Sequence, residues 1–403
     1  MHLLVVNSGS SSIKFSIFAA GNGSPHSLYE GELSGIGSGH ATIYFNPSSG
    51  KDKKPPAPVQ AQDSVEAIGR VVEAVKQYSL PRVDAVGYRI VHPGAKLDHH
   101  TRITEAVLHE LDEAVVFAPL HDPSAIKIIR DTMARIPHVP HFACFDTVFH
   151  QTMPETASTY AIPLEYRERG AHRYGFHGLS YESIVAQIRE ASMTMPHRMV
   201  IAHLGSGCSI TALIDGRSID TTMGLTPTGG VVMGTRPGDL DPGLVLYLLR
   251  QAKGDRTEAV NAVEQVLNFA SGVAALSGLP NDMRSTRKAA ADGNTRAQLA
   301  IDIFTPSIRK SIGSFSWLLG GLDAIVFTGG IGEHDTRSRT EILAGLEPLG
   351  VSLDVKLNDA EKSDSQTELW RISASQSESA IFVIPAKEDW MIARHVQSML
   401  GES

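Results

Sequence analysis

Two stretches of this sequence repeat one another and decide the fold. The first is Val5-Val6-Asn7-Ser8-Gly9-Ser10-Ser11-Ser12-Ile13, and the second is Ile201-Ala202-His203-Leu204-Gly205-Ser206-Gly207-Cys208-Ser209. Each has the pattern of an apolar strand, a Gly/Ser-rich turn and a second strand. The turns are not P-loops, because a P-loop needs Gly-Lys-Ser/Thr opening a helix.

Two further correspondences follow in the same order. Val83–Val86 matches Leu322–Val326, and His141–Asp146, a strand ending in an acid, matches Ile381–Glu388 more loosely. Three ordered matches indicate a duplicated α/β unit, and 403 residues are too many for one ordinary core. We therefore expect two similar domains, with ligands bound in a cleft between their turns.

Capping patterns place several helices and strands. Asp63 is expected to cap a helix, and Asp122-Pro123 and Asp241-Pro242 each combine an N-cap with proline at the first helical position. A long helix is expected over Asn294–Leu319. Residues 19–62 are rich in Gly, Pro, Ser and Lys, and we expect surface excursions there around one or two edge strands near Ala41–Phe45.

Composition excludes several classes of protein. The formal net charge of −8 argues against nucleic acid as the main partner, although local arginines still allow an anionic small substrate. Cys144 and Cys208 fit neither a disulfide framework nor a metal site. No signal peptide and no apolar run of roughly 20 residues is present, so we expect a cytoplasmic protein without a membrane partner.

Two glycine-rich segments are candidates for phosphate or nucleotide binding. Around Asn7–Lys14, backbone N–H groups and hydroxyls can cradle phosphate oxygens while Lys14 supplies a positive charge. In Asp323–His334, a strand, a glycine-dense turn and a helix follow one another, which suits backbone contact with a nucleotide. A hairpin and a tight strand-to-helix turn without function are the alternatives.

Three basic groups and two acids complete the candidate site. Arg89 lies in an apolar strand, where an arginine is costly unless it meets an anion. His177 by itself is equally consistent with a structural and a catalytic role, and Arg236 in its Gly/Pro loop is also consistent with the surface. Asp146 and Glu388 end apolar strands at matching places in the two halves, a position suited to holding Mg²⁺.

Other histidines fit no zinc-binding pattern. His99-His100 and His138-Val139-Pro140-His141 lack the His-Glu-x-x-His spacing, and we interpret them as structural or solvated.

Together these motifs resemble the acetate kinase family over almost the whole chain. The matching segments are Val6–Phe18, Arg89–His92, Ala118–Pro123, Phe145–His150, Arg173–Gly178, His203–Ser209, Met223–Pro242, Asp282–Arg284, Ala324–Glu333 and Ile384–Ala393. The resemblance implies duplicated ribonuclease H-like domains of the actin-like ATPase architecture with a central active-site cleft. It implies an N-terminal domain over 1–149, completed by about 385–403, a nucleotide-binding domain over 150–384, and a homodimer.

The resemblance also implies roles for individual residues. Asp146, His177, Arg236 and Arg89 match catalytic positions, with Arg89 binding the substrate carboxylate, and Asn7 and Glu388 match the Mg²⁺ positions; Mn²⁺ is an alternative ion. Val91, Leu120, Phe176 and Pro227 match a small pocket for the acyl methyl group. The ATP-binding positions are Lys14, His203, Leu204, Gly205, Ser206, Gly207, Asp282, Met283, Arg284, Gly330, Ile331, Gly332, Glu333 and His334.

The implied activity is reversible, Mg²⁺-dependent phosphorylation of acetate by ATP through direct in-line transfer. A carboxylate substrate is already ionised at pH 7, so we expect Asp146 to orient Mg²⁺ or the attacking oxygen without carrying a proton. Pro93 and Ser206 depart from the family pattern. Propionate or butyrate is an alternative substrate, an actin-like ATPase is an alternative of a different class, and pyrophosphate is an alternative to ATP, although the open turn at Gly329–Gly332 favours a nucleotide.

Overall fold

The computed structural model describes residues 1–9, 11–50, 53–77, 82–115, 122–360 and 369–401. The chain divides into two compact units. The first comprises Met1–Val148, Gly178–Ser183 and Lys387–Ser403, and the second comprises Phe149–His177 and Ile184–Ala386. No helix among the described residues is long and apolar enough to cross a membrane.

The first unit is built on a sheet of eight described strands in the order β5-β4-β3-β2-β1-β6-β8-β7. Strands β1, β2, β3 and β4 form an antiparallel meander, while β1, β6 and β8 run parallel. The elements are β1 (His2–Ser8), β2 (Ser12–Ala19), β3 (His26–Ser34), β4 (Thr42–Pro47), β5 (Ala57–Pro58), α1 (Ser64–Gln77), β6 (Ala85–Ile90), β7 (Thr101–Arg102), α2 (Glu105–Ala114), α3 (Asp122–Arg135), β8 (His141–Phe145) and α15 (Glu388–Gly401).

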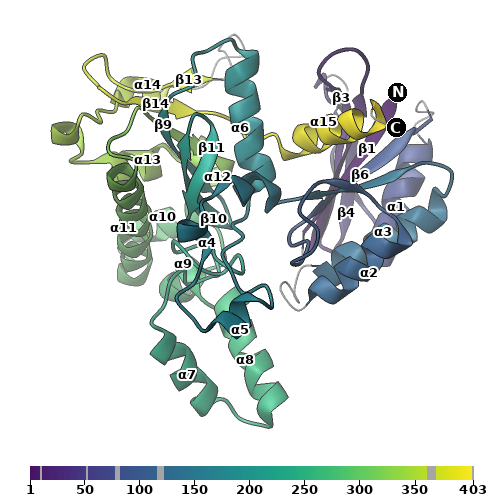
Figure 1. Ribbon diagram of the computed structural model, residues 1–403, viewed down its shortest axis with the longest axis horizontal. Coiled ribbons are helices and arrows are strands. Elements are labelled where there is room, and N and C mark those ends of the chain that lie inside the picture. Colours follow the sequence, from purple (N-terminus) through teal and green to yellow (C-terminus); the bar gives the residue numbers. More distant parts are fainter. Residues whose placement is uncertain (10, 51–52, 78–81, 116–121, 361–368, 402–403) are drawn as a thin grey trace. The chain divides into compact units, whose positions relative to one another are not determined.

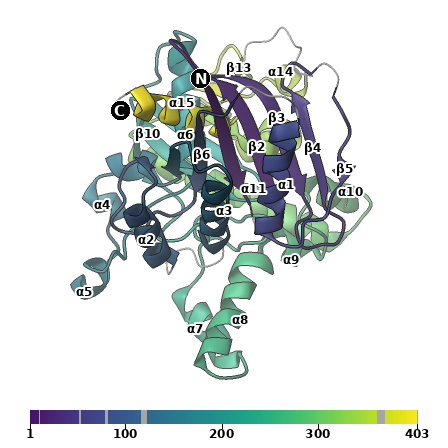
Figure 2. The same cartoon turned by 90° about the vertical axis from the view of Figure 1, so that its right-hand side faces the viewer.

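Helices cover both faces of this sheet. Helix α15 packs on β1 and β6, and α1 and α3 pack together on the opposite face (Figure 1). Figure 2 shows α1 in front of the strands of the meander. Side chains alternate along β1, so Leu4 and Val6 join the apolar core under α1 and α3. Asn7 points the other way and reaches α15.

The second unit repeats the same sheet order. Its strands run β11-β10-β9-β12-β14-β13, with β11, β10 and β9 antiparallel and β9, β12 and β14 parallel. The strands are β9 (Arg198–Leu204), β10 (Cys208–Ile214), β11 (Arg217–Thr221), β12 (Ala324–Thr328), β13 (Trp370–Arg371) and β14 (Ala380–Val383). The order β3-β2-β1-β6-β8 in the first unit therefore corresponds to β11-β10-β9-β12-β14 in the second. The predicted duplication is confirmed.

The helices of the second unit surround this sheet, and α7 and α8 project from the rest of the unit as a pair (Figures 1 and 2). Helix α6 begins in the first unit and continues in the second. The helices are α4 (Glu155–Ser158), α5 (Leu164–Arg167), α6 (Gly178–Glu190), α7 (Pro242–Gln251), α8 (Arg256–Phe269), α9 (Gly272–Ser277), α10 (Met283–Ala291), α11 (Thr295–Leu318), α12 (Gly329–His334), α13 (Thr336–Leu343) and α14 (Val355–Asp359).

The expected helices after Asp63, Asp122 and Asp241 and the long helix over Asn294–Leu319 are confirmed as α1, α3, α7 and α11. The interpretation of residues 19–62 was incomplete. The segment His26–Ser34 is a nine-residue strand paired along its length with β2 and from Tyr29 to Ser34 with β4. From Glu30 to Ser34 its polar residues alternate with the buried Gly31 and Leu33, so its low apolar content concealed a strand that has a polar face.

The placement of Glu388 at the end of a strand in the second half was wrong. Strand β14 ends at Val383, and Glu388 is the first residue of α15, which belongs to the first unit. Glu388 and Asp146 are therefore not equivalent acids of two halves. Both lie in the first unit, because the chain leaves the second unit after Ala386.

A substitution at Gly87 of β6 can test how tightly α15 packs on the first sheet. A Cβ at this position would lie 2.7 Å from both Ile392 Cγ2 and Val396 Cγ2 of α15. We predict that Gly87→Ala destabilises the unit by about 1–3 kcal/mol through overpacking. The thermal unfolding midpoint should fall by several degrees. The control is Gly401→Ala in the same helix, where a Cβ meets nothing within 4 Å; equal shifts for the two variants would contradict the packing argument.

Candidate active site

The first unit brings Asn7, Arg89 and Asp146 together at the carboxyl ends of its parallel strands. The Arg89 guanidinium donates from Nη2 to Asp146 Oδ2 at 2.6 Å and from Nε to both Asp146 oxygens at 3.1 Å. Its Nη1 lies 3.3 Å from Asn7 Oδ1 and 3.4 Å from Glu388 Oε2. Because β1, β6 and β8 are adjacent and parallel, residues at their ends share one edge of the sheet.

The N-terminus of α15 completes this group. Asn7 Nδ2 donates to Glu388 Oε2 at 3.3 Å and to Asp389 Oδ1 at 3.2 Å, and Ser16 donates to Asp389 Oδ2 at 2.8 Å. Lys14 lies opposite Asn7 in the β1–β2 ladder. Asp389 and Ser16 were missed by the sequence analysis. The pairing of β1 with β2 would have placed Ser16 near the group, but no local pattern indicated that Asp389 reaches it.

The surroundings of this group shift the pKa values of Arg89 and Asp389. Burial by itself would lower the pKa of Arg89, but Asp146 and Glu388 outweigh it and hold the pKa above its ordinary value. Burial raises the pKa of Asp389, an effect that the hydrogen bonds from Ser16 and Asn7 partly oppose. The group contains three acidic side chains, Asp146, Glu388 and Asp389. Two basic side chains, Arg89 and Lys14, are too few to neutralise them. The surplus negative charge and oxygen ligands suit a hard divalent cation.

The second unit gathers His177, His203 and Arg236 around the turn at Gly207. The rings of His177 and His203 stack with centroids 4.1 Å apart, and His177 Nδ1 lies 2.8 Å from Ser209 Oγ. A Cβ on Gly207 would lie 3.4 Å from both Arg236 Nη1 and His177 Nε2. The loop holds Arg236 through a bond from its Nη1 to the Pro227 carbonyl at 3.1 Å.

The backbone of His177 is itself unusual. It adopts the left-handed conformation, with φ of 59°, immediately before α6 begins at Gly178. A non-glycine residue in this region is uncommon and costs free energy, and such outliers concentrate at functional positions. The conformation is thus a second reason, independent of the sequence motif, to regard His177 as functional.

A pocket of about 340 Å³ lies in the second unit next to this turn. It includes eight of the positions predicted to bind nucleotide: Gly205, Ser206, Asp282, Met283, Arg284, Gly330, Ile331 and His334. Asn281, Arg287 and Asp335 also line it and were not predicted. Asn281 donates to Ser206 Oγ at 2.8 Å, so it holds the turn on which the predicted residues lie.

The remaining predicted nucleotide residues of the second unit do not line this pocket. Leu204 is fully buried, and the Glu333 carboxylate accepts hydrogen bonds from the backbone N–H groups of Gly329 and Ala386. Gly332 is buried and His203 stacks on His177. These residues support the glycine turns at Gly205 and Gly330 without lining the pocket themselves.

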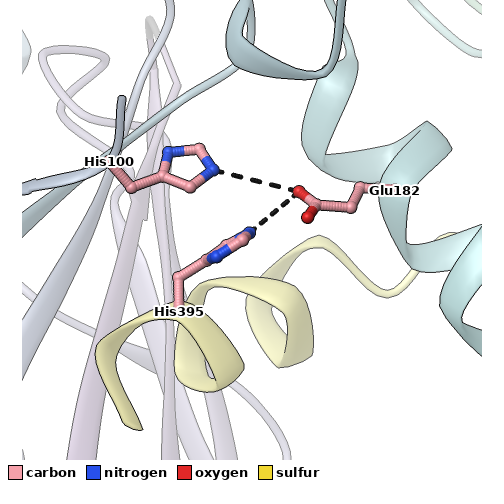
Figure 3. Close-up of side chains that lie close together, drawn as sticks. All are labelled: His100, Glu182 and His395. Atoms are coloured by element: carbon pink, nitrogen blue, oxygen red, sulfur yellow. Dashed lines mark hydrogen bonds and ion pairs between the residues drawn. The ribbon is translucent and has the colours of Figure 1, made fainter. Parts of the chain in front are cut away.

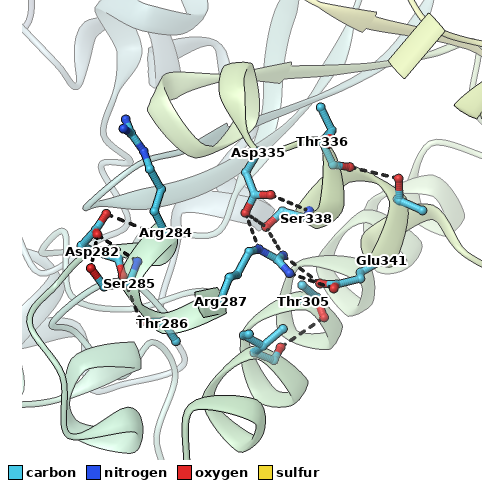
Figure 4. A network of polar contacts seen from close by, with 12 residues as sticks. Asp282, Arg284, Ser285, Thr286, Arg287, Thr305, Asp335, Thr336, Ser338 and Glu341 are labelled. Atoms are coloured by element: carbon cyan, nitrogen blue, oxygen red, sulfur yellow. Dashed lines mark hydrogen bonds and ion pairs between the residues drawn. The ribbon is translucent and has the colours of Figure 1, made fainter. Parts of the chain in front are cut away.

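Ion pairs and hydrogen bonds hold several of the residues that line the pocket (Figure 4). Arg287 bonds Asp335 at 2.6 Å and both oxygens of Glu341 at 2.9 Å. Asp282 caps the start of α10 by accepting from the backbone N–H groups of Arg284 and Ser285. Figure 4 shows the Arg284 side chain extending away from the Arg287 group, so its charge is not taken up by Asp335 or Glu341.

The residues predicted to contact the acyl methyl group belong to both units. Val91 belongs to the first unit, Phe176 and Pro227 belong to the second, and Leu120 lies outside the described residues. Phe176 is fully buried and Val91 is half-buried. This pocket therefore stays a prediction.

The fold, the group around Arg89 and the group around His177 together define the class of protein. The repeated sheet order is that of duplicated ribonuclease H-like domains, the architecture of actin-like ATPases and related kinases. The model of the Acetokinase family matches residues 2–394. The chain belongs to the acetokinase family, whose members are phosphotransferases with a carboxyl group as acceptor.

Individual relatives agree with this assignment. The chain is 37% identical to the acetate kinase of Halothermothrix orenii, with 98% of each chain covered. Among solved structures, it is similar to a propionate kinase from Francisella tularensis, with 34% identity, 98% of each chain covered and a TM-score of 0.86. It is also similar to Porphyromonas gingivalis acetate kinase, with 31% identity, 99% of each chain covered and a TM-score of 0.84.

Arg339 supports the glycine turn of the pocket from inside the protein, and sequence analysis missed it. Its side chain is fully buried, and it donates to the carbonyls of Gly332 and Glu333 at 2.8 and 3.0 Å and to Asn358 Oδ1 at 2.7 Å. Burial lowers the pKa of Arg339 to about 10. The guanidinium thus serves the last carbonyls of α12, which have no partner within the helix.

We predict that Arg339→Met destabilises the second unit by at least ~2 kcal/mol, because several buried acceptors lose their donor. The measurement is the thermal unfolding midpoint. The control is Arg337→Met on the same helix, where the side chain is exposed and a shift close to zero is expected. An unchanged midpoint for Arg339→Met would show that the turn does not depend on this guanidinium.

Proposed function

We propose that this chain is an acetate kinase, which transfers the γ-phosphoryl group of ATP to acetate and catalyses the reverse transfer from acetyl phosphate to ADP. The observation that carries the proposal is Arg89. It is a guanidinium at the carboxyl ends of the parallel strands, held by Asp146 and Asn7 and 19% exposed. A positioned guanidinium is suited to binding a planar carboxylate.

The acidic group around Arg89 fits a bound Mg²⁺. Asn7 and Glu388 would hold the ion, as proposed from the sequence, and Asp389, which accepts a hydrogen bond from Asn7, would support it. Their oxygen atoms are the ligands that Mg²⁺ prefers, and Mn²⁺ would accept the same set. When bound, the ion would neutralise negative charge on the transferring phosphoryl group.

The transfer requires charge balance more than proton transfer. A carboxylate oxygen of acetate attacks the γ-phosphorus, the bond to the β–γ bridging oxygen breaks, and ADP leaves with that electron pair. Acetate is ionised at neutral pH, so no base is needed. Arg89 orients the acetate, Asp146 orients Arg89 and the attacking oxygen, and His177 and Arg236 stabilise the equatorial phosphoryl oxygens.

The pocket in the second unit supports ATP as the phosphoryl donor. Its glycine turns at Gly205 and Gly330 allow close backbone approach, and Arg284 adds a positive charge. We further propose that Lys14 contacts the phosphates. The fold would equally suit an actin-like ATPase, but hydrolysis alone gives no reason to hold Arg89 between Asp146 and Asn7.

We also propose that the two compact units are the two catalytic domains and that the protein is a cytoplasmic homodimer. Several large apolar side chains on the projecting helix pair are exposed, which is typical of a protein interface. They are Leu244, Leu246 and Tyr247 of α7 and Val260, Val266 and Phe269 of α8. A mass of 43.4 kDa in sedimentation equilibrium, that of a single chain, would contradict the dimer.

Trapping of the acyl phosphate with hydroxylamine tests the proposed activity. With ATP and Mg²⁺, acetate is expected to give the most product. Propionate and butyrate are the competing substrates, and one methylene is worth only about 1–3 kcal/mol of discrimination. A preference for either would change the assigned acid, product formed from pyrophosphate but not from ATP would change the donor, and ATP hydrolysis without any trapped product would overturn the kinase assignment.

Asp146→Asn tests the orienting role of this carboxylate. We predict a fall of about 10²–10³-fold in kcat, since Arg89 loses its closest anionic partner, together with an altered Mg²⁺ dependence. The pH dependence should be retained. Asp112→Asn is the control, because Asp112 forms an exposed pair with Arg130. If Asp146→Asn removed a titration from the pH–rate profile and left the Mg²⁺ dependence unchanged, Asp146 would be a proton carrier.

A further inference from the structure

Three side chains of the first unit meet on the α15 side of the sheet (Figure 3). His100 follows β6 in sequence, Glu182 lies on α6 and His395 lies on α15. His395 Nε2 is 2.8 Å and His100 Nε2 is 3.9 Å from the same oxygen, Glu182 Oε2. The centroids of the two imidazole rings are 3.9 Å apart, and the His100 side chain is only 9% exposed.

The other nitrogen of His100 faces a backbone donor. The N–H of Phe145 donates to His100 Nδ1 at 3.1 Å. This nitrogen must therefore offer a lone pair, and in the neutral ring the proton is on Nε2, which faces Glu182. Phe145 is the residue before Asp146, so this bond holds the backbone amide one residue before the proposed orienting carboxylate.

His100, Glu182 and His395 are residue types that bind metals. However, the ring proton of His100 is on Nε2, the nitrogen that would have to bind the metal. A metal ion on His100 Nε2 needs the lone pair there, which would put the ring proton on Nδ1. That proton would point at the N–H of Phe145. The hydrogen bond to Phe145 therefore favours a carboxylate held between two imidazoles over a bound metal.

We propose that His100 is a positioning residue that holds the Phe145 backbone amide, one residue before Asp146, only while its imidazole is neutral, with Glu182 and His395 fixing the tautomer. Protonation puts a hydrogen on Nδ1, and the bond from the Phe145 N–H is then lost. Phosphoryl transfer is lost with it as the pH falls. This inference rests on the proposed function insofar as Asp146 is taken to act in that reaction.

The surroundings of His100 favour the neutral ring. Burial is the main cause that lowers the pKa of His100 below its ordinary 6.5; His395 and His99 act in the same direction, and Glu182 opposes them. Burial would raise the pKa of Glu182, but the two imidazoles bring it down to about 2, so Glu182 is ionised throughout. Burial raises the pKa of the neighbouring Cys144 thiol, which stays neutral.

The sign of the effect follows from these directions. Because the pKa of His100 is lowered, its neutral form and the bond to Phe145 are fully present above pH 6.5, the ordinary value. Both are lost as the pH falls below that value and through the lowered pKa. The nucleotide pocket contains none of these residues. The loss should therefore appear in kcat and leave the KM for ATP unchanged.

His100→Asn separates the two roles of the ring, because the Asn oxygen accepts from the Phe145 N–H but does not titrate. Wild-type kcat should fall by about tenfold per pH unit below the pKa of His100. His100→Asn should remove this acid limb and keep kcat at neutral pH within about threefold. The control is His99→Asn, whose side chain is 75% exposed and pairs with Asp98; it should retain the wild-type profile. An acid limb retained in His100→Asn would overturn the proposal.

Hydrogen exchange of the Phe145 amide provides a readout that does not depend on activity. Its protection should be high in the wild type and in His100→Asn, and about tenfold lower in His100→Leu, which lacks an acceptor. Unchanged protection in His100→Leu would overturn the proposal, as would stabilisation by Zn²⁺ that His395→Asn abolishes. If no acyl phosphate forms at any pH, the proposed function fails, whereas the exchange result still decides whether His100 holds this amide.

Discussion

The structure of the first unit depends on how it accommodates the positive charge of Arg89. A guanidinium on a central strand loses most of its hydration, and the loss is tolerable only if anions and hydrogen-bond acceptors replace water. Asp146 supplies a bidentate partner from the next strand, Asn7 supplies an amide oxygen, and Glu388 adds a second carboxylate. One charge thus joins β1, β6, β8 and α15 at a single point.

The two units share a fold but differ in the residues at the ends of their equivalent strands. In the ladders, Val6 pairs with Tyr88 and Ala202 pairs with Phe327, so Asn7 and Arg89 correspond to His203 and Thr328. At equivalent sites, the first unit has a charged residue that requires carboxylates and the second has a buried threonine beneath a glycine turn. The sheet order is the same in both units, whereas the charge at the strand ends differs in kind.

Much of the architecture could be predicted because its signals are local. A strand, a Gly/Ser turn and a returning strand occur within nine residues, and this pattern predicted both sheets and the positions of Asn7, His203 and Gly207. The local pattern misplaced Glu388 because an apolar run followed by Pro385 does not show that the chain returns to the first unit; only the family resemblance implied that return. Asp389, Arg339 and the hydrogen bond of His100 were missed for a related reason, since each depends on a partner distant in sequence.

The histidines illustrate this limit most clearly. His99 and His100 are neighbours and neither fits a zinc pattern, yet His99 is exposed beside Asp98 and His100 is buried between Glu182 and Phe145. Their difference arises from where α6 and α15 pack. His177 differs again, because its left-handed backbone and its bond to Ser209 fix the ring before any ligand binds. A rigid imidazole needs no reorganisation when charge develops nearby, which is the property that a group stabilising a transition state requires.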